Sequence, residues 1–262
     1  MDIGGKVAVV TGGVHGLGAV TAMRLNELDA RVVVADIEDL GKSEEPGLAK
    51  AIRSCRKLDV RNIAQWRQVL AEVVQDEGAL DIVHLNAGVI SRPLSQEMDD
   101  DPLDWVTEQV LERVTAINIT GVANGVIAAL PYLCKSHGSI VITASIAGVR
   151  GYVVDPIYSM SKHAVVGLAR ALAPRLIKDG VKINVVCPGG MDTRMVPDAI
   201  RPKAVLSTPQ HMADVICRVI RGGGTGGIWL APADDTVRRF DIDPIAYTAD
   251  QASQRQPGAD LV

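Results

Sequence analysis

The sequence alternates short, continuously apolar runs with longer segments of helical periodicity, and this alternation limits the possible folds more than any other feature. Residues 6–11 and 31–36 are two valine-rich runs, each long enough for one buried strand, and a helical pattern over residues 19–28 joins them. Further strands are expected at 55–58, 79–85, 139–143, 182–186 and 227–230, and further helices at 47–53, 63–77, 104–133, 158–177 and 209–220. Repeated strand–helix–strand units predict the α/β class: a doubly wound parallel sheet of about seven strands in a three-layer α/β/α arrangement.

A glycine-rich turn lies where the first strand passes into the first helix. Gly12, Gly16 and Gly18 have the spacing G-x-x-x-G-x-G. Glycine at such a junction lets the backbone approach a phosphate, and the N–H groups at the start of the helix favour negative charge. A purely structural turn is the alternative, whereas a P-loop is excluded because no lysine followed by serine or threonine comes after the last glycine. The position of the turn favours a dinucleotide site.

Asp36 ends the second strand, where a carboxylate can accept hydrogen bonds from a ribose 2′-hydroxyl and repel a 2′-phosphate. Its alternative role is a turn or helix-capping aspartate. The next residue, Ile37, carries no charge that offsets the carboxylate, so the sequence favours NAD over NADP. His15, beside the glycines, is the residue placed to approach a phosphate, although histidine is mostly neutral at pH 7.

Composition excludes several classes of function. The net charge is −4 and the basic residues are scattered, so a nucleic-acid partner is not expected. No signal-peptide pattern opens the chain, and we expect a cytoplasmic protein with reduced thiols. The apolar window at 114–133 is interrupted by polar residues and proline, which favours a buried helix or an oligomer interface over a membrane span. The cysteines are too far apart to suggest a metal site or a disulfide framework: Cys55, Cys134, Cys187 and Cys217.

Tyr158 and Lys162 are four residues apart on an expected helix, so their side chains share one face. A phenol is a weak acid–base group near neutral pH, and a neighbouring ammonium favours its ionised form. Taken alone, the pair is more readily explained as a half-buried tyrosine beside an ordinary lysine. Its interpretation depends on the motifs around it.

The motifs follow one another in a specific order along the chain: Thr11-Gly12-x-x-x-Gly16-x-Gly18, Asp59-Val60, Asn86-Ala87-Gly88, Asn118, Ser145, Tyr158-x-x-x-Lys162, and Pro188-Gly189 with Thr193. This series resembles the short-chain dehydrogenase/reductase family in its single-domain form, over about residues 5–230. The resemblance implies a Rossmann-type, NAD-binding domain at 1–230 that includes a substrate lid at about 190–208. The remaining residues, 231–262, form a polar tail that we expect to be loop or partly disordered.

The resemblance also implies roles for individual residues. Tyr158 corresponds to the general acid/base, Ser145 to the residue that binds the substrate oxygen, and Asn118 to the holder of a water in a proton relay. Lys162 corresponds to the residue that binds the nicotinamide ribose and lowers the pKa of the tyrosine, and Gly18 packs the helix on the sheet. The residues expected around the cofactor are Gly12, His15, Gly16, Leu17, Asp36, Asp59, Val60, Asn86, Ala87, Gly88, Tyr158, Lys162, Pro188, Gly189, Met191 and Thr193.

These roles predict an NAD-dependent oxidoreductase that interconverts a secondary alcohol and a ketone. The alternatives are an NADP-preferring carbonyl or ketoacyl reductase of the same fold, and a non-catalytic NAD-binding regulator. A sugar-nucleotide epimerase is disfavoured because it needs a longer C-terminal substrate domain. By the resemblance we expect a homotetramer or homodimer, and the tail could block one interface. The substrate is expected to be a hydrophobic small molecule, bound by the lid at 194–206 and by Ile90, Ile146, Val149, Tyr152 and Val153.

Overall fold

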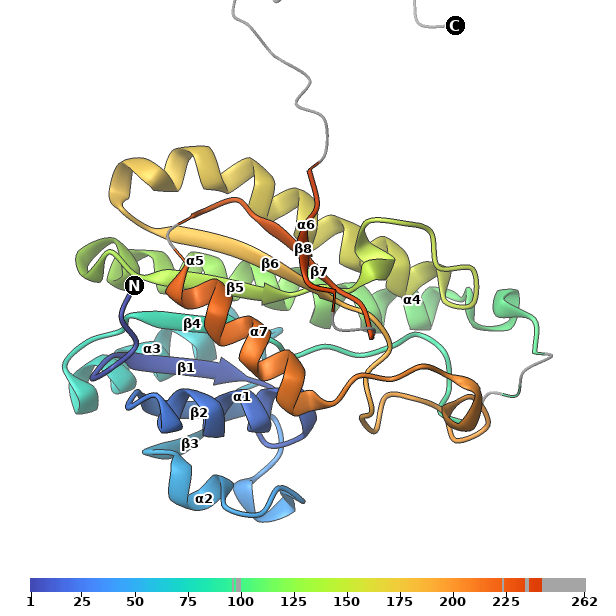
Figure 1. The fold of residues 1–262 in the computed structure, drawn as a ribbon, viewed down its shortest axis with the longest axis horizontal. Helices are drawn as coiled ribbons and strands as arrows, with labels where there is room; N and C mark the ends of the chain where they lie inside the picture. The colour runs from blue at the N-terminus through green and yellow to red at the C-terminus, as the bar shows by residue number, and fades with distance from the viewer. Residues whose placement is uncertain (96, 98–99, 223, 234–235, 242–262) are drawn as a thin grey trace, which may run out of the picture.

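The fold is built around one sheet of eight strands, seven of them parallel (Figure 1). The computed structural model describes residues 1–95, 97, 100–222, 224–233 and 236–241. The strand order is β3-β2-β1-β4-β5-β6-β7-β8. Strands are added toward one edge of the sheet from β1 to β3 and toward the other edge from β4 onward, so the order reverses between β1 and β4. The strands are β1 (Val7–Thr11), β2 (Arg31–Asp36), β3 (Ser54–Lys57), β4 (Ile82–Leu85), β5 (Ser139–Thr143), β6 (Lys182–Pro188), β7 (Ile228–Ala231) and β8 (Arg238–Arg239).

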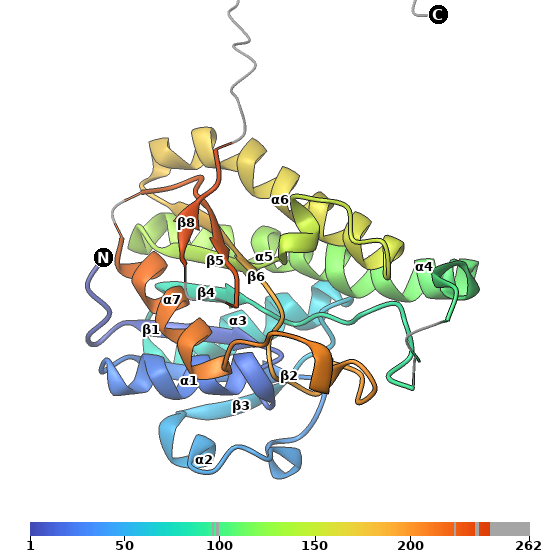
Figure 2. The ribbon, with the colours of Figure 1, turned by 45° about the vertical axis from the view of Figure 1, so that its right-hand side comes forward.

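Helices cover both faces of the sheet, which confirms the predicted doubly wound, three-layer architecture (Figures 1 and 2). Helices α1 and α7 pack together on one face, while α3, α5 and α6 cover the other face. In the middle of the sheet Val9 pairs with Val33 of β2 and Val83 of β4, and all three side chains are buried. The helices are α1 (Gly16–Glu27), α2 (Leu48–Ala51), α3 (Ile63–Glu77), α4 (Glu108–Thr115), α5 (Gly121–Ser136), α6 (Pro156–Leu176) and α7 (Pro209–Arg221).

The long helical stretch expected at 104–133 is stepped near Gly121 and is not one continuous helix. A short 3₁₀ turn, Pro102–Trp105, precedes α4, and a π-helical turn, Ala116–Thr120, joins α4 to α5 just before Gly121. A Cβ at Gly121 would lie 2.7 Å from Val60 Cγ2, so glycine allows α5 to pack closely there. The stretch Glu108–Ser136 is long and apolar enough to cross a membrane, but 44% of its most apolar window is buried inside the fold.

The tail expected to be loop from residue 231 onward contributes a strand instead. Arg238 and Arg239 of β8 pair antiparallel with Leu230 and Trp229 of β7, and Phe240 packs partly buried against the core. The prediction of about seven strands therefore missed one, because a two-residue strand has no periodicity that a sequence pattern can reveal. The rest of the expected tail, residues 234–235 and 242–262, lies outside the described residues.

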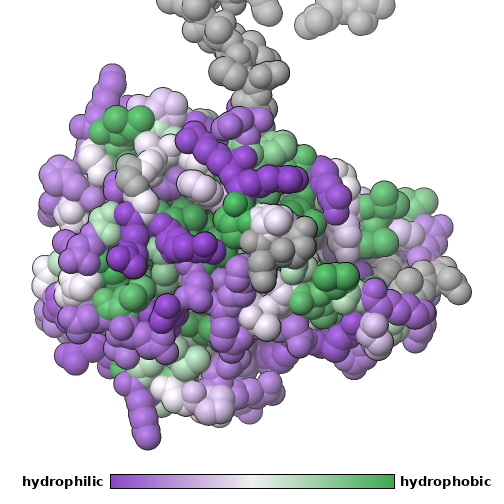
Figure 3. Space-filling model, in the orientation of Figure 1, coloured by the Kyte–Doolittle hydropathy of each residue, from purple (hydrophilic) through white to green (hydrophobic). Residues whose placement is uncertain are grey.

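The outer surface carries no continuous apolar face in the view of Figure 3, where hydrophobic side chains form separate patches among hydrophilic ones. Exposed large apolar residues are spread over several elements, for example Ile127 on α5 and Met160 on α6. The carboxyl ends of the parallel strands are therefore the feature of the fold that points most clearly to function, since ligands of open α/β sheets bind there, next to the change in strand order.

Candidate active site

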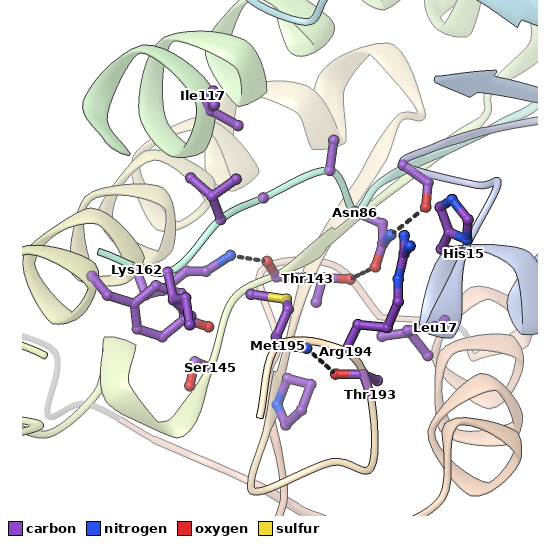
Figure 4. Close-up of a pocket in the computed structure, with 18 of the residues that line it drawn as sticks. His15, Leu17, Asn86, Ile117, Thr143, Ser145, Lys162, Thr193, Arg194 and Met195 are labelled. Carbon is purple, nitrogen blue, oxygen red and sulfur yellow. Dashed lines mark hydrogen bonds between the residues drawn. The ribbon is translucent and has the colours of Figure 1, made fainter. Parts of the chain in front are cut away.

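A pocket of about 620 Å³ opens at the carboxyl ends of the strands, within the size range of small-molecule sites. It is lined by every residue predicted from the sequence to bind cofactor or take part in catalysis, with Asn118 as the one exception. Figure 4 shows side chains from the glycine turn, the strand ends and the segment after β6 facing this space. Segments far apart in the sequence thus contribute to one site.

The glycine turn at the start of α1 fits a pyrophosphate. Gly12 and Gly16 have positive φ angles of 60° and 50°, a conformation that glycine adopts without strain. A Cβ at Gly12 would lie 2.9 Å from Ala87 Cα, and one at Gly16 would lie 3.5 Å from Thr193 Cγ2, so side chains there would narrow the pocket. Helix α1 has no side-chain cap and no acidic residue in its first turn. Its N–H groups are therefore suited to an anionic ligand.

Asp36 lies at the end of β2 beside this turn, and 9% of the residue is exposed. Its Oδ2 accepts a hydrogen bond from Val14 N at 2.9 Å, and its Oδ1 accepts one from Glu38 N at 2.9 Å. The carboxylate thus fixes the turn and still lines the pocket, where its charge can meet a ribose.

His15 binds a carboxylate in this structure, although the sequence suggested a phosphate contact. Its Nε2 lies 3.1 Å from Glu38 Oε2, and this hydrogen bond lowers the pKa of Glu38. Glu38 is a pocket residue that the sequence analysis missed. Its position two residues beyond Asp36 was the available signal. The two carboxylates make this end of the pocket acidic.

Asp59 and Val60 line the same end of the pocket, as expected for residues around the cofactor. Arg61 binds both carboxylate oxygens of Asp59, and this contact lowers the pKa of Asp59. The Val60 carbonyl accepts a hydrogen bond from Trp66 Nε1 at 3.0 Å. Both residues are therefore held in place by neighbours on the loop and on α3 before any ligand binds.

The segment Asn86-Ala87-Gly88 follows β4 and approaches the glycine turn. Asn86 Nδ2 donates to the carbonyls of Thr11 and Gly12 at 3.1 and 3.3 Å. Gly88 lies so near α6 that an added Cβ would be 3.4 Å from Lys162 Nζ. These contacts place the glycine turn and α6 against the same short segment.

Tyr158 and Ser145 both line the pocket, and their side chains are in contact. Ser145 precedes the 3₁₀ turn Ile146–Gly148 and accepts a hydrogen bond from Ala147 N at 3.1 Å, which orients its hydroxyl. Burial raises the pKa of Tyr158 to about 12, and its contact with Ser145 acts in the opposite direction. The pKa of the phenol is thus above its ordinary value here, although the tyrosine–lysine pair suggested a lower one.

Lys162 is 4% exposed, and its Nζ lies 5.5 Å from the centre of the Tyr158 ring. The ammonium donates to the Thr143 carbonyl at 3.0 Å, as the dashed line in Figure 4 shows. Burial lowers the pKa of Lys162 to about 8. The same burial that makes the phenol less acidic therefore makes the lysine less basic, and each effect reduces the charge in the site.

Asn118 lies in the π-helical turn and is completely buried, so it does not line the pocket. Its Oδ1 accepts from Val89 N at 2.8 Å, and its Nδ2 donates to Val89 O and to Ser161 Oγ at 2.8 and 3.0 Å. Both amide hydrogens are used within the protein, which leaves one lone pair of Oδ1 for the water of the expected relay. The relay stays a prediction.

The segment after β6 closes the pocket from the other side. Its expected cofactor residues line the cavity, together with Arg194, Met195 and Val196 of the expected lid. On the substrate side Ile90, Ile146 and Tyr152 also line it, as predicted from the sequence. Val149 and Val153 do not, and Val153 points to solvent with 81% of its surface exposed.

Other residues were missed because they come from segments without a motif. Arg92, which is buried, lies over the Tyr152 ring at 5.9 Å and lines the pocket with Arg113 and Ile117. Within the described part of the chain no group of three or more histidine, cysteine, aspartate or glutamate residues is arranged to hold a metal ion.

Comparison with known proteins agrees with this geometry. A family model described as short chain dehydrogenase matches residues 6–203, and the chain belongs to that family. It is an oxidoreductase family that uses nicotinamide cofactors, and the match confirms the resemblance found in the sequence.

Individual relatives cover most of the chain. Secoisolariciresinol dehydrogenase of Forsythia intermedia is 32% identical over 73% of this chain and 68% of its own length. The 15-hydroxyprostaglandin dehydrogenase (NAD(+)) of Mus musculus is 33% identical over 74% of this chain and 70% of its own. Among solved structures, a short chain dehydrogenase from Mycobacterium paratuberculosis bound to NAD is similar with a TM-score of 0.74. It is 28% identical, over 90% of this chain and 98% of that chain.

Proposed function

We propose that the protein is an NAD-dependent dehydrogenase that interconverts a secondary alcohol and a ketone. The observation that carries the proposal is the shared pocket, in which Ser145, Tyr158 and Lys162 lie on the same cavity as the glycine turn and Asp36. A bound nicotinamide would accept or donate the hydride, so the protein has to supply orientation and a proton. Residues 1–230 would form one cofactor-binding unit with the lid at about 190–208.

The glycine turn and the N-terminus of α1 would hold the pyrophosphate, and Asp36 would accept hydrogen bonds from the adenosine ribose. Thr193 and Met191, with Pro188 and Gly189, would bind the nicotinamide end. Lys162 would bind the second ribose. All of these residues line the same pocket, which supports the assignment.

Tyr158 would take the proton of the alcohol hydroxyl during oxidation and return it to the ketone during reduction. Ser145 would donate a hydrogen bond to the same substrate oxygen and stabilise negative charge on it. Because Lys162 is buried beside the phenol, its positive charge would favour the ionised form of Tyr158 when the substrate proton is transferred.

The substrate side of the pocket is mostly apolar. Ile90, Ile117, Ile146, Met195 and Val196 line it. Such a lining favours a hydrophobic secondary alcohol or ketone over a sugar. The direct test is NADH absorbance with a panel of hydrophobic secondary alcohols and ketones, with NAD(H) and NADP(H) in parallel. Tight NADH binding without turnover of any panel member would instead support a non-catalytic NAD-binding regulator.

Cofactor choice can be tested at Asp36. We expect Asp36→Ala to raise KM for NAD about tenfold, because the ribose hydroxyl loses its hydrogen-bond acceptor. The variant should also discriminate less against NADP, because no carboxylate remains to repel the 2′-phosphate. Asp36→Asn removes the charge with little change in shape and separates the two effects. Asp39→Asn is a matched control, since the Asp39 side chain is 83% exposed and does not line the pocket. An unchanged preference in both Asp36 variants would contradict the ribose contact.

The pH dependence should differ between the two directions. Alcohol oxidation needs the phenolate, and burial raises the pKa of Tyr158 to about 12. Below that pKa each pH unit changes the phenolate fraction about tenfold. We expect kcat/KM for oxidation to rise between pH 6 and 9. The rise should be less steep above about pH 8, because burial lowers the pKa of Lys162 to about 8 and the charge that favours the phenolate is lost there. Ketone reduction uses the neutral phenol and should not rise over this range. Steady-state rates in both directions check this, and a pH-independent oxidation rate would contradict Tyr158 as the base.

A further inference from the structure

A histidine that the proposed mechanism does not use is buried in the centre of the sheet. His84 lies in β4 between Val10 of β1 and Val141 of β5, and its exposed fraction is zero. Its surroundings are apolar, and burial lowers the pKa of its ring to about 3, so it is neutral near pH 7. A polar ring in this position is costly unless it is hydrogen-bonded.

One ring nitrogen has a partner whose direction can be deduced. His84 Nε2 lies 2.8 Å from Thr143 Oγ1 on the neighbouring strand, and Thr143 Oγ1 lies 3.2 Å from Asn86 Oδ1. Asn86 uses its amide nitrogen for the carbonyls of Thr11 and Gly12, so the atom facing Thr143 is an acceptor. The single hydroxyl hydrogen of Thr143 must therefore point to Asn86.

The histidine tautomer follows from this. Because the Thr143 hydroxyl has no second hydrogen, Nε2 of His84 carries the proton and donates to Thr143. Nδ1 then carries none, and it has no hydrogen-bond partner among the described residues. The result is a series of hydrogen bonds in which His84 donates to Thr143, Thr143 donates to Asn86, and Asn86 donates to the backbone of the glycine turn. Figure 4 draws the hydrogen bonds made by Asn86 as dashed lines.

This series of hydrogen bonds ends at the atoms that shape the cofactor pocket. Asn86 Nδ2 holds the Gly12 carbonyl at 3.3 Å, and the Gly12 backbone packs against Ala87. The backbone carbonyl of Thr143 binds Lys162, but its position is set by the pairing of Thr143 with Val186 in the sheet rather than by the Thr143 side chain. Loss of the side-chain hydrogen bonds should therefore affect the cofactor turn and leave the lysine in place.

We propose that His84 is a positioning residue for cofactor binding, acting through the Thr143 hydroxyl to hold Asn86 and the glycine turn in the binding conformation. The role rests on the proposed use of a nicotinamide cofactor. It is distinct from catalysis because His84 does not line the pocket.

The test is NADH binding, measured by fluorescence titration of the full-length protein, for His84→Leu, Thr143→Val and the double variant. Each single variant should raise Kd for NADH about tenfold, the size expected for one lost hydrogen bond in a partly buried network. Both substitutions interrupt the same series of hydrogen bonds. The Kd of the double variant for NADH should therefore be only slightly higher than that of either single variant. With a substrate from the alcohol panel, KM for NAD should rise while kcat stays near its original value.

Two further variants make the outcome decisive. Thr143→Ser keeps the hydroxyl and should recover most of the affinity. Thr21→Val is a control for the loss of a threonine hydroxyl, since Thr21 is completely buried and its hydroxyl has no hydrogen-bond partner in the described structure. If His84→Leu folds and binds NADH as tightly as the original protein, the positioning role is wrong. If the unmodified protein does not bind NADH, the proposed function fails instead.

Discussion

Replacing Tyr158 with phenylalanine is expected to lower kcat roughly a thousandfold, because the ring stays and only the proton-transferring hydroxyl is lost. The backbone N–H of residue 158 keeps its hydrogen bond to Asp155, which caps α6, so α6 should not move. NADH affinity and melting temperature should therefore stay close to those of the unmodified protein. Steady-state turnover, fluorescence titration and thermal denaturation measure the three quantities on the same preparation.

Tyr132→Phe is a matched control for this substitution. Tyr132 lies on α5, packs partly buried against the core and does not line the pocket. It should keep full activity. Turnover of Tyr158→Phe at the original rate would show that another group moves the proton.

Replacing Gly18 with alanine is expected to destroy the cofactor site. A Cβ at Gly18 would lie 2.1 Å from the Gly12 carbonyl oxygen and 2.7 Å from Asn86 Nδ2. The first contact is with backbone, so either α1 or the glycine turn has to shift. We expect Kd for NADH to rise about a hundredfold or more and the melting temperature to fall by roughly 10 °C, as for a severe overpacking change.

The expected destabilisation by Gly18→Ala is the opposite of what a glycine-to-alanine substitution usually does in a helix. In an ordinary helix, glycine to alanine stabilises by up to about 1 kcal/mol. Gly167→Ala on α6 provides that comparison, because an added Cβ there meets nothing within 4 Å. It should raise the melting temperature slightly. Equal effects at the two positions would contradict the close packing of the turn on α1.

Much of the site was predictable because its residues belong to short local patterns. Gly12 and Gly16 follow a strand, Asp36 ends the next strand, and Tyr158 and Lys162 share one helix face. The parallel sheet then brings the strand ends to a common edge, and this explains why the fold and the lining of the pocket agree with what the motifs and the family resemblance implied.

The parts that were not predicted depend on which strands become neighbours. The hydrogen bond between His84 and Thr143 joins residues that are 59 positions apart. A histidine inside an otherwise apolar run was the available signal, but its partner is defined only by the pairing of β4 with β5. Likewise, the raised pKa of Tyr158 follows from burial, which a helical spacing does not reveal.

The short strand β8 affects how readily the sheet can aggregate through its edges in a concentrated protein solution. An unpaired strand edge can recruit strands of other molecules and so start aggregation. Among the described residues, the two outermost strands are β3 and β8. Arg56 and Lys57 lie in β3, and β8 consists of Arg238 and Arg239, both exposed. Because arginine and lysine side chains are costly to desolvate, these residues disfavour the addition of a further copy at either end of the sheet.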